Sequence, residues 1–353
     1  VEEKIHSVLR YKYGNESMGE IAKGIGVHES IFSAWVRLYE HHVRVAVIQA
    51  ASVIMDRDAS IEKAVSLIKQ AGEKGAKIVV FPEAFIPAYP RGLSFGTIIG
   101  SRTEDGRKDW YRYWENSIPV PGEATEQLGA VAREAGVYVV MGVIERDSGC
   151  SGGTLYCSVI FIGPDGSLLG KHRKLKPTAA ERIVWGEGDG STLPVFETPY
   201  GKIGALICWE NYMPLARAAM YAQGVQLYIA PTADARESWQ STIRHIAMEG
   251  RCFVLSSNQY VTKDMYPKDL ACYDDLVSSP DVMSNGGSAI VGPLGDYVAE
   301  PVWGKDEIII ADLDIKQIVY TQFDFDPVGH YSRPDVFKLL VNKDKQESTI
   351  WMK

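Results

Sequence analysis

From residue 43 onward the chain alternates between short apolar runs and longer stretches with helical spacing. Residues 43–49 form a mainly apolar run, with Arg44 within it and Gln49 at its end, that predicts a strand. The apolar positions within 60–75 recur at helical intervals, which predicts an amphipathic helix. The same alternation predicts strands at 78–81, 137–144, 202–207, 226–230 and 252–257 and helices at 126–136, 215–223 and 237–250. Because helices that connect successive strands cover the faces of a sheet, the pattern predicts a layered α/β domain.

Two segments predict antiparallel strands. Residues 156–171 and 287–313 are rich in strand-forming residues, and each contains a short turn, at 163–166 and at 292–295. Both turns hold a proline and glycines, whose backbone preferences fit turn dihedrals. From the pattern alone, the fold class is therefore layered α/β with some antiparallel hairpins.

Residues 1–42 have a different pattern. Three short helical segments are predicted at 7–13, 18–24 and 30–41, with a glycine-containing turn at 24–27 before the third. The arrangement resembles a helix-turn-helix unit of the transposase or repressor type, which would imply DNA binding. However, the segment carries five Lys or Arg against six Glu, a net charge of -1, whereas a DNA-binding unit needs a basic surface. We therefore expect a small helical appendage, with a DNA-binding regulator that senses a small molecule as the remote alternative.

Composition and charge narrow the class of protein. With 46% hydrophobic residues among 353, the chain can bury a substantial core. The net charge of -8 provides no overall attraction for nucleic acid or an anionic membrane, so a small molecule is the expected partner. No uninterrupted apolar run reaches about 18 residues, and no basic stretch precedes an apolar one near the start. We therefore expect a soluble protein that is not secreted.

The cysteines indicate the compartment. They lie at positions 150, 157, 208, 252 and 272, and this odd number argues against a disulfide framework and for a reducing, cytoplasmic location. Cys150 and Cys157 have no histidine between them and lack the usual zinc spacings. We expect no metal and no other cofactor.

Cys208 is the first candidate for chemistry. It directly follows the apolar run 202–207 and precedes a predicted helix, so it would lie at a strand-to-helix turn, where a side chain can face a cleft at the strand ends. A free thiol is a weak nucleophile at neutral pH and needs a base or a cation nearby. Considered alone, a cysteine after an apolar strand is more often a buried core residue.

Two further features could assist such a thiol. Glu83 follows the predicted strand at 78–81 and Pro82, where a carboxylate serves either as a general base or as a favourable charge at a helix N-terminus. The basic cluster at 171–176 closes another predicted strand and leads through Glu181 to a glycine-rich loop at 185–190. Taken alone, the cluster indicates a solvated strand end. The loop does not form a phosphate site, because no Lys-Ser or Lys-Thr pair closes it.

Together, the order and types of these residues resemble the nitrilase branch of the carbon–nitrogen hydrolase superfamily across residues 43–341. By this resemblance Cys208 is the nucleophile, Glu83 the catalytic glutamate, Lys174 the catalytic lysine and Glu181 the second glutamate. The match extends to Tyr-Pro-Arg-Gly at 89–92, Pro-Thr-Ala-Asp at 231–234 and the stretch 329–335. Trp-Glu follows the nucleophile at 209–210, as in nitrilases and cyanide-degrading relatives, whereas amidases and carbamoylases commonly have Tyr-Asp there.

The resemblance implies a four-layer α-β-β-α sandwich over 43–341, followed by a tail at 342–353, and assembly into dimers or larger, helical homo-oligomers. It implies hydrolysis of an organic nitrile to a carboxylic acid and ammonia through a covalent cysteine intermediate. Glu83 would accept the thiol proton, Lys174 would face the charge that develops on nitrogen, and Glu181 would orient Lys174 or the substrate. The alternatives that use the same residues are a cyanide hydratase or dihydratase and an aliphatic amidase.

The substrate itself stays open between arylacetonitriles, aliphatic nitriles and cyano-amino acids. Aromatic and hydroxyl side chains beside the motifs are candidates to line its pocket, although each is as consistent with simple packing: Tyr89, Trp185, Trp209 and Thr232. His245 and His330 are expected to have structural roles.

Overall fold

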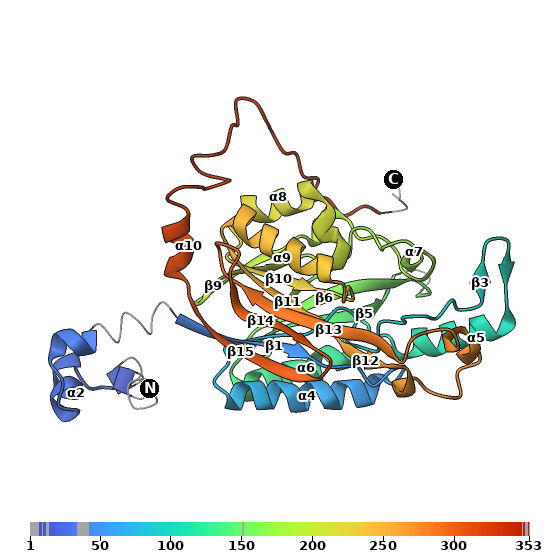
Figure 1. The fold of residues 1–353 in the computed structure, drawn as a ribbon, viewed down its shortest axis with the longest axis horizontal. Helices are drawn as coiled ribbons and strands as arrows, with labels where there is room; N and C mark the ends of the chain where they lie inside the picture. Colours follow the sequence, from blue (N-terminus) through green and yellow to red (C-terminus); the bar gives the residue numbers. More distant parts are fainter. Residues whose placement is uncertain are drawn as a thin grey trace.

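The computed structural model describes residues 7, 8, 10, 11, 14–33, 42–149, 152–347, 349 and 352. Two mixed β-sheets dominate these residues (Figure 1). The first has the order β15-β1-β2-β5-β6-β7, with β1 (His42–Gln49), β2 (Ile78–Val80), β5 (Tyr138–Arg146), β6 (Leu155–Ile162), β7 (Leu168–Arg173) and β15 (Glu307–Asp314). The second has the order β12-β13-β11-β10-β9-β8, and β14 pairs with β13. Its strands are β8 (Val195–Thr198), β9 (Gly201–Ala205), β10 (Leu227–Pro231), β11 (Phe253–Ser257), β12 (Tyr260–Thr262), β13 (Val282–Val291) and β14 (Tyr297–Trp303).

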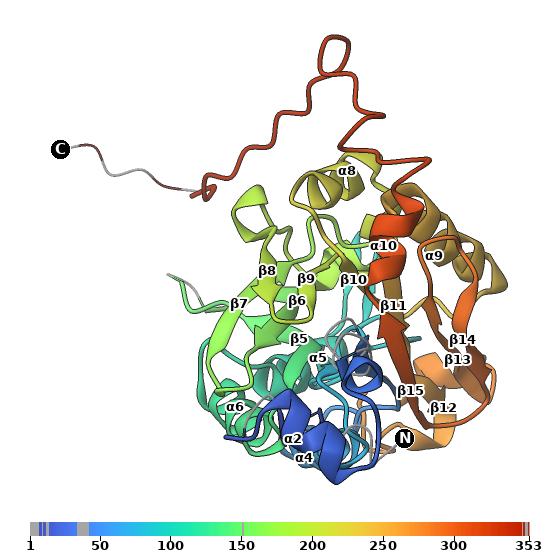
Figure 2. The same ribbon diagram turned by 90° about the vertical axis from the view of Figure 1, so that its left-hand side faces the viewer.

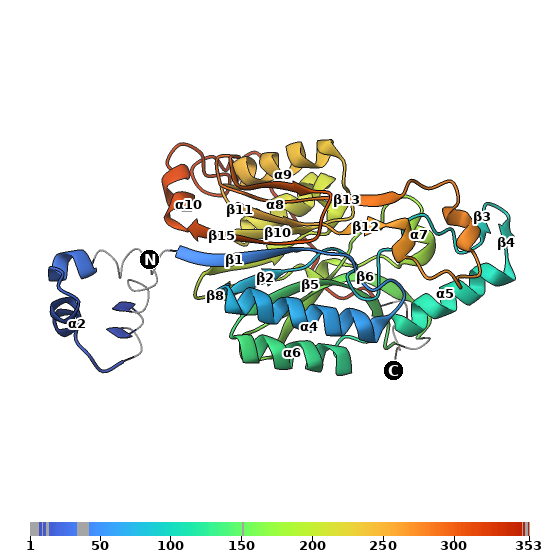
Figure 3. The same ribbon diagram turned by 60° about the horizontal axis from the view of Figure 1, so that its bottom comes forward.

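Helices cover the outer face of each sheet. Figure 3 shows α4 (Arg57–Glu73) and α6 (Glu123–Ala135) on one side of the two sheets and α8 (Pro214–Ala222) and α9 (Glu237–Gly250) on the other. This is the expected four-layer α-β-β-α sandwich, and the predicted fold class is confirmed. The helix predicted at 60–75 begins earlier, because the Asp56 side chain accepts a hydrogen bond from the Ala59 backbone N–H (2.9 Å) and caps it.

The apolar runs in the sequence are continuous because each central strand is buried on both faces. Along β1, Val43, Val45 and Val47 join the core between the sheets, whereas Ala46 and Ile48 join the core beneath α4 and α6. Strands that are covered on both faces lack polar alternation. The core between the sheets therefore draws on every second residue of strands in both layers.

The strand directions bring several chain segments to one edge of the molecule. Strands β1, β2 and β5 pair in parallel, as do β9, β10 and β11. Because β6 is antiparallel to both β5 and β7, β7 runs in the same direction as β5. The carboxyl ends of β2 and β7 thus lie at the same edge of the first sheet, where parallel strands commonly position functional side chains.

Helix α5 (Glu104–Asn116) was not among the predicted helices, and neither were the short helices α7 (Glu181–Val184) and α10 (Lys316–Thr321). Helix α5 fully buries Gly106, Asp109 and Tyr113, and Trp110 and Trp114 pack partly buried against the core between the sheets. Asp109 is buried because its carboxylate accepts the backbone N–H groups of Ala271 (2.9 Å) and Cys272 (2.7 Å). The inner face of this helix combines glycine, an acid and aromatic rings, and the helix contains no aliphatic residue, so the aliphatic spacing that indicated the other helices is missing.

Residues near the N-terminus form a separate small lobe beside the start of β1 (Figure 1). Its core consists of Val8, Ile21, Ala22 and Phe32. Helix α2 (Met18–Gly24) matches the second predicted segment and starts at a capping box between Ser17 and Glu20. Residues 29–33 begin the third helix, but most of the segment predicted at 30–41 lies outside the described residues, as do parts of 7–13.

The chain beyond α10 (Lys316–Thr321) runs as an extended segment past α8 (Figure 2). Its end is held by hydrogen bonds from the Gln346 backbone N–H to Asp189 (2.8 Å) and from Lys343 to Gln223 (3.2 Å). Within the part of the chain that the structure describes, no helix is long and apolar enough to cross a membrane.

Candidate active site

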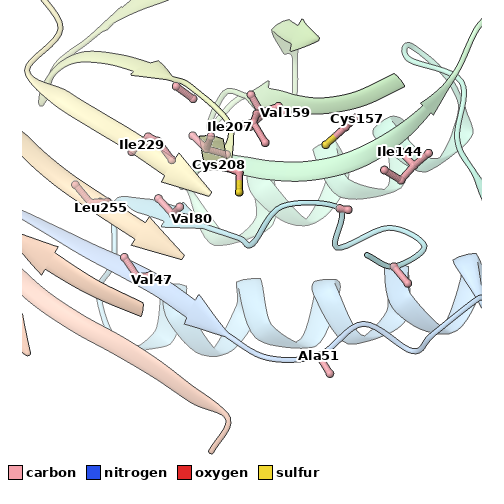
Figure 4. Close-up of a cluster of buried hydrophobic side chains, with 14 of the residues drawn as sticks. Val47, Ala51, Val80, Ile144, Cys157, Val159, Ile207, Cys208, Ile229 and Leu255 are labelled. Carbon is pink, nitrogen blue, oxygen red and sulfur yellow. The ribbon is translucent and has the colours of Figure 1, made fainter. Parts of the chain in front are cut away.

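Cys208 lies where β9 gives way to the short 3-10 helix η2 (Cys208–Tyr212). Its φ of 52° is in the left-handed region, which is unfavourable for a residue with a side chain. The turn is fixed by the Asn211 amide, which donates to the carbonyl of Leu206 (2.9 Å) and to that of Cys208 (2.8 Å). The thiol is thereby held in the layer of side chains between the two sheets (Figure 4).

Lys174 joins the two glutamates. Its Nζ donates to Oε1 of Glu83 (2.7 Å) and to Oε2 of Glu181 (2.7 Å). Both Lys174 and Glu83 are fully buried. Burial opposes the charge on the lysine, but Glu83, the neighbouring thiols and Glu181 together outweigh it and raise the pKa of Lys174 well above its ordinary value. The Lys174 ammonium therefore stays charged, and it is shared by two carboxylates, those of Glu83 and Glu181.

Glu83 keeps one oxygen without a hydrogen bond. Among the described residues, its Oε2 atom is buried and has no partner. Burial raises the pKa of Glu83, repulsion from Glu181 adds to this, and Lys174 acts in the opposite direction. A buried carboxylate oxygen that lacks a donor is costly, and such groups are rare outside functional sites.

Glu181, by contrast, has both oxygens occupied. Oε1 accepts from the Tyr89 hydroxyl (2.6 Å), and Oε2 accepts from Lys174 and from the Thr178 backbone N–H (2.6 Å). Trp185 packs edge-on against Tyr89, with 5.7 Å between the ring centroids, and its ring centroid lies 5.8 Å from the Lys174 Nζ. Two of the predicted substrate-binding residues, Tyr89 and Trp185, therefore lie next to the Lys174–Glu181 pair.

The Cys208 thiol is in its protonated form in this setting. Burial raises its pKa to about 12, the Glu83 charge adds to the shift, and Lys174 and Thr232 oppose it. Thr232 Oγ1 donates to the Cys208 sulfur (3.2 Å) and itself accepts from the Asp234 backbone N–H (2.9 Å). A thiol whose pKa lies this far above neutrality is almost entirely protonated, so attack requires proton transfer to a base.

Trp209 lies away from these contacts. Its Nε1 donates to Asp234 (2.9 Å), the Arg236 guanidinium lies over its ring, and the residue is 39% exposed. Of the four predicted substrate-binding residues, Thr232 contacts the nucleophile, Tyr89 and Trp185 adjoin Lys174, and Trp209 is the most exposed.

The basic cluster is divided by strand alternation. Lys171 and Arg173 point to the buried Glu145, whereas His172 and Lys174 point to Glu210 and Glu83. Successive residues of a strand face opposite sides, so a single run of cations serves two sites. The sequence shows this alternation, but it does not show which acids lie opposite each face.

Glu210 and His172 form a buried pair whose link to the site is not evident in the sequence. Glu210 accepts from His172 Nε2 (3.0 Å) and from the backbone N–H groups of Ile207 (2.6 Å) and Leu175 (2.5 Å). The other ring nitrogen, Nδ1, contacts the Thr192 carbonyl. Because both partners are acceptors, both ring nitrogens must donate, which describes an imidazolium. This pair links the turn before the nucleophile to the residue after Lys174.

The remaining sequence candidates lie outside this cluster. His245 is exposed and 3.7 Å from Glu249, and His330 packs edge-on against Tyr331 with a 5.5 Å centroid distance. Among the residues that the structure describes, no three His, Cys, Asp or Glu side chains group as a metal site would. Cys150, one member of the cysteine pair considered in the sequence, lies outside the described residues.

Known proteins resemble this chain in both sequence and fold. A family model described as carbon–nitrogen hydrolase matches residues 44–322. The chain is 54% identical to an aliphatic nitrilase of Sinorhizobium fredii, over 87% of this chain and 98% of that protein. It is 53% identical to a bifunctional nitrilase/nitrile hydratase of Lupinus angustifolius (85% and 86% covered) and 49% identical to nitrilase 2 of Arabidopsis thaliana (85% and 89% covered).

Solved structures with the same fold are much more distant in sequence. A carbon–nitrogen hydrolase from Helicobacter pylori is 22% identical, with a TM-score of 0.66 over 85% of this chain and 98% of that one. An amidase from Nesterenkonia sp. is 19% identical, with a TM-score of 0.59 over 79% and 93%. At these identities the likeness establishes the sandwich fold.

Proposed function

This chain belongs to the carbon–nitrogen hydrolase family, and we propose that it is a nitrilase, which converts an organic nitrile to a carboxylic acid and ammonia. The observation that carries the proposal is the buried group of Cys208, Glu83, Lys174 and Glu181, in which one glutamate oxygen is left without a donor. About half of the residues are identical to those of nitrilases over nearly the whole length of those proteins, which supports the same choice of substrate class.

In the first step, Oε2 of Glu83 accepts the thiol proton while the Cys208 sulfur bonds to the nitrile carbon. The carbon–nitrogen triple bond becomes a double bond, and the nitrogen takes that same proton from Glu83, which gives a covalent thioimidate and restores the carboxylate. The Lys174 ammonium stabilises the charge that develops on nitrogen. In a buried site, such a donor is worth roughly 3–4 kcal/mol of activation barrier, by analogy with oxyanion-hole donors.

In the second stage, one water adds to the thioimidate carbon and ammonia leaves, which produces a thioester. A second water then cleaves the thioester, releases the acid and restores the thiol. Glu83 serves as the base for both waters, since it holds the oxygen without a partner. Glu181 orients Lys174 instead of transferring protons, because both of its oxygens already accept hydrogen bonds.

Tyr89, Trp185 and Thr232 line the substrate position in this proposal, with Trp209 at its rim. The name of the Sinorhizobium fredii relative favours aliphatic nitriles as the first class to test. The bifunctional Lupinus angustifolius relative supports a second product, the amide. It forms when the tetrahedral intermediate breaks its bond to the Cys208 sulfur and keeps the nitrogen.

The test is a panel of aliphatic, arylaceto- and cyano-amino acid nitriles, scored for ammonia, acid and amide with the full chain. We expect acid and ammonia in equal amounts from the preferred nitrile, and none from Cys208→Ala. A mass adduct on Cys208 is expected to accumulate in Lys174→Met or Glu181→Gln. Turnover by Cys208→Ala at the wild-type rate, or direct formation of amide without an adduct, would disprove the covalent route.

We also propose that the protein is a cytoplasmic homo-oligomer. Large apolar side chains are exposed beside the site and along the C-terminal segment: Tyr212, Leu215, Phe323, Phe337 and Leu340. Patches of this kind mark association surfaces. Cysteines 157, 208, 252 and 272 are all free thiols, as a reducing compartment would keep them. Light scattering of the purified chain tests the assembly, and fractionation of cells tests the compartment.

For the domain organisation we propose a helical appendage at 1–42, a hydrolase domain at 43–341 and a tail at 342–353. The separate core of the N-terminal lobe supports the first boundary. Because the appendage has a net charge of -1, we propose that it does not bind DNA. A salt-dependent shift of genomic fragments in a gel would overturn this assignment.

A further inference from the structure

A second buried thiol lies in the active site and takes no part in the reaction described above. Cys157 is on β6, and its sulfur lies 3.5 Å from Oε1 of Glu83. Its backbone carbonyl accepts the Lys174 backbone N–H (2.8 Å). The residue therefore contacts the base through its side chain and the catalytic lysine through its backbone.

The contact is with the occupied oxygen of Glu83. Oε1 accepts from both Lys174 Nζ (2.7 Å) and the Cys157 thiol (3.5 Å), whereas Oε2 has no partner among the described residues. Burial raises the pKa of Cys157 well above its ordinary value, and the Glu83 charge adds to this. A thiol that stays protonated beside a carboxylate donates its proton to it, so Cys157 acts on Glu83 as a hydrogen-bond donor.

We propose that Cys157 is a positioning residue: with Lys174 it fixes Oε1 of Glu83, so that Oε2 is the oxygen that exchanges protons with Cys208 and with water. This inference rests on the proposed function, in which Glu83 is the base. A base with one oxygen anchored by two donors keeps a single orientation, and a small misplacement of a base costs much of its rate advantage.

Several other ionisable groups interact with Glu83, and all of them remain when Cys157 is replaced. They come from the segment after β7, from α7 (Glu181–Val184), from η2, from the loop after β2 and from α5: Lys174, Glu181, Cys208, Tyr89 and Tyr113. A changed pH profile in a Cys157 variant therefore reports the lost donor, provided that these residues stay in place.

Replacing Cys157 by alanine removes a donor that favours the ionised carboxylate. The apparent pKa of the coupled Glu83–Lys174 group should rise, so the acid limb of kcat/KM should move to higher pH by about half a unit to one unit. We also expect kcat at the plateau to fall about threefold to tenfold, because the base is less well oriented. Cys157→Ser keeps a donor at the same position and should return the limb toward the wild-type profile.

Cys252 provides a matched control. It is also fully buried, but it belongs to the core beneath α8 and α9. Cys252→Ala should therefore lower thermal stability without moving the acid limb. Cys157→Val fills the volume without a donor and gives the same test if the alanine variant does not fold.

The experiment is the pH profile of kcat/KM for these variants on the best nitrile of the panel, together with mass detection of the Cys208 adduct. The inference is supported if the acid limb of the kcat/KM profile moves to higher pH in Cys157→Ala and lies close to the wild-type position in Cys157→Ser. Superimposable profiles for wild type and Cys157→Ala, or an equal shift in Cys252→Ala, overturn it. Wild type that neither turns over nitriles nor forms an adduct overturns the proposed function instead, so the two failures are distinct.

Discussion

Glu83 and Glu145 are both buried and are both paired with cations from the same four-residue stretch, yet their hydrogen bonding differs. Glu145 accepts from Ser158 (2.9 Å) and from Arg173 Nε (3.0 Å) at Oε2, and Lys171 (2.5 Å) occupies Oε1. Within the described part of the chain, Glu83 accepts only at Oε1, and its Oε2 has no donor. Burial and a cationic partner are thus common to both glutamates. The free oxygen is what distinguishes a carboxylate that can act as a base from one that only holds strands together.

The difference follows from how many cations serve each acid. Glu145 is paired with two cations, Lys171 and Arg173, whose side chains are 25% and 20% exposed. The opposite face of the stretch provides the single lysine that Glu83 shares with Glu181, with no exposed area on its side chain. Every carboxylate oxygen of the first cluster has a donor and its cations are partly exposed, whereas the second cluster has two acids for one fully buried cation. Four substitutions or conditions can break this comparison.

The largest effect is expected for Glu83→Gln. Loss of the base should reduce kcat/KM about 10²- to 10⁴-fold, the usual contribution of a general base, with little change in the unfolding temperature. Steady-state kinetics and thermal unfolding of the same preparation measure both. Activity within about tenfold of wild type would remove Glu83 from the role of base.

Gly142→Ala should disturb Glu83 from the neighbouring strand. A Cβ at Gly142 would lie 2.6 Å from the Glu83 Cα and closer still to the Pro82 carbonyl, so the backbone beneath the base must shift. We expect kcat/KM to fall about 10²-fold, as for a base misplaced by about 1 Å. Gly153→Ala is the control, because its added Cβ meets nothing within 4 Å. Equal kinetics for the two variants would contradict the expected close contact.

Glu145→Gln should affect stability and spare catalysis. Removing the acid leaves Lys171 and Arg173 without their shared partner, and because both cations reach solvent we expect a loss of about 2–3 kcal/mol in the free energy of unfolding, at the low end for a broken buried pair. Urea unfolding measures this loss, and kcat should remain within about threefold of wild type. A catalytic defect as large as that of Glu83→Gln would show that saturation does not separate the two roles.

The smallest effect concerns the His172–Glu210 pair. Burial opposes protonation of His172, but the Glu210 carboxylate and the Thr192 carbonyl together outweigh it and raise the pKa of His172 above its ordinary value. The stabilisation is therefore complete below the unfolded-state pKa and is lost as the pH rises through the folded-state pKa. We expect the unfolding free energy to decline as the pH rises above about 6.5, the ordinary histidine pKa, with a shallower decline in His172→Gln. Parallel curves would mean that the pair is not an ion pair.

The sequence by itself determined the layered fold and the identities of the main candidates. Apolar runs and helical spacing predicted most strands and helices, since burial on two faces and on one face leaves different periods. Helix α5 was missed because its inner face consists of aromatic rings, an acid and a glycine, with no aliphatic residue. The family resemblance is confirmed, and the roles of Cys208, Glu83, Lys174 and Glu181 remain predictions.

Only the tertiary structure decided which polar atoms have hydrogen-bond partners. Strand order and register, which periodicity does not encode, bring Cys157 to Glu83 and Glu210 to His172 across long separations in the chain. Among the residues that the structure describes, the same contacts leave Oε2 of Glu83 without a donor, whereas both oxygens of Glu181 accept hydrogen bonds. A pattern along the chain specifies the face on which a side chain lies, whereas its partners come from other strands, so the difference between a structural and a catalytic carboxylate appears only after folding.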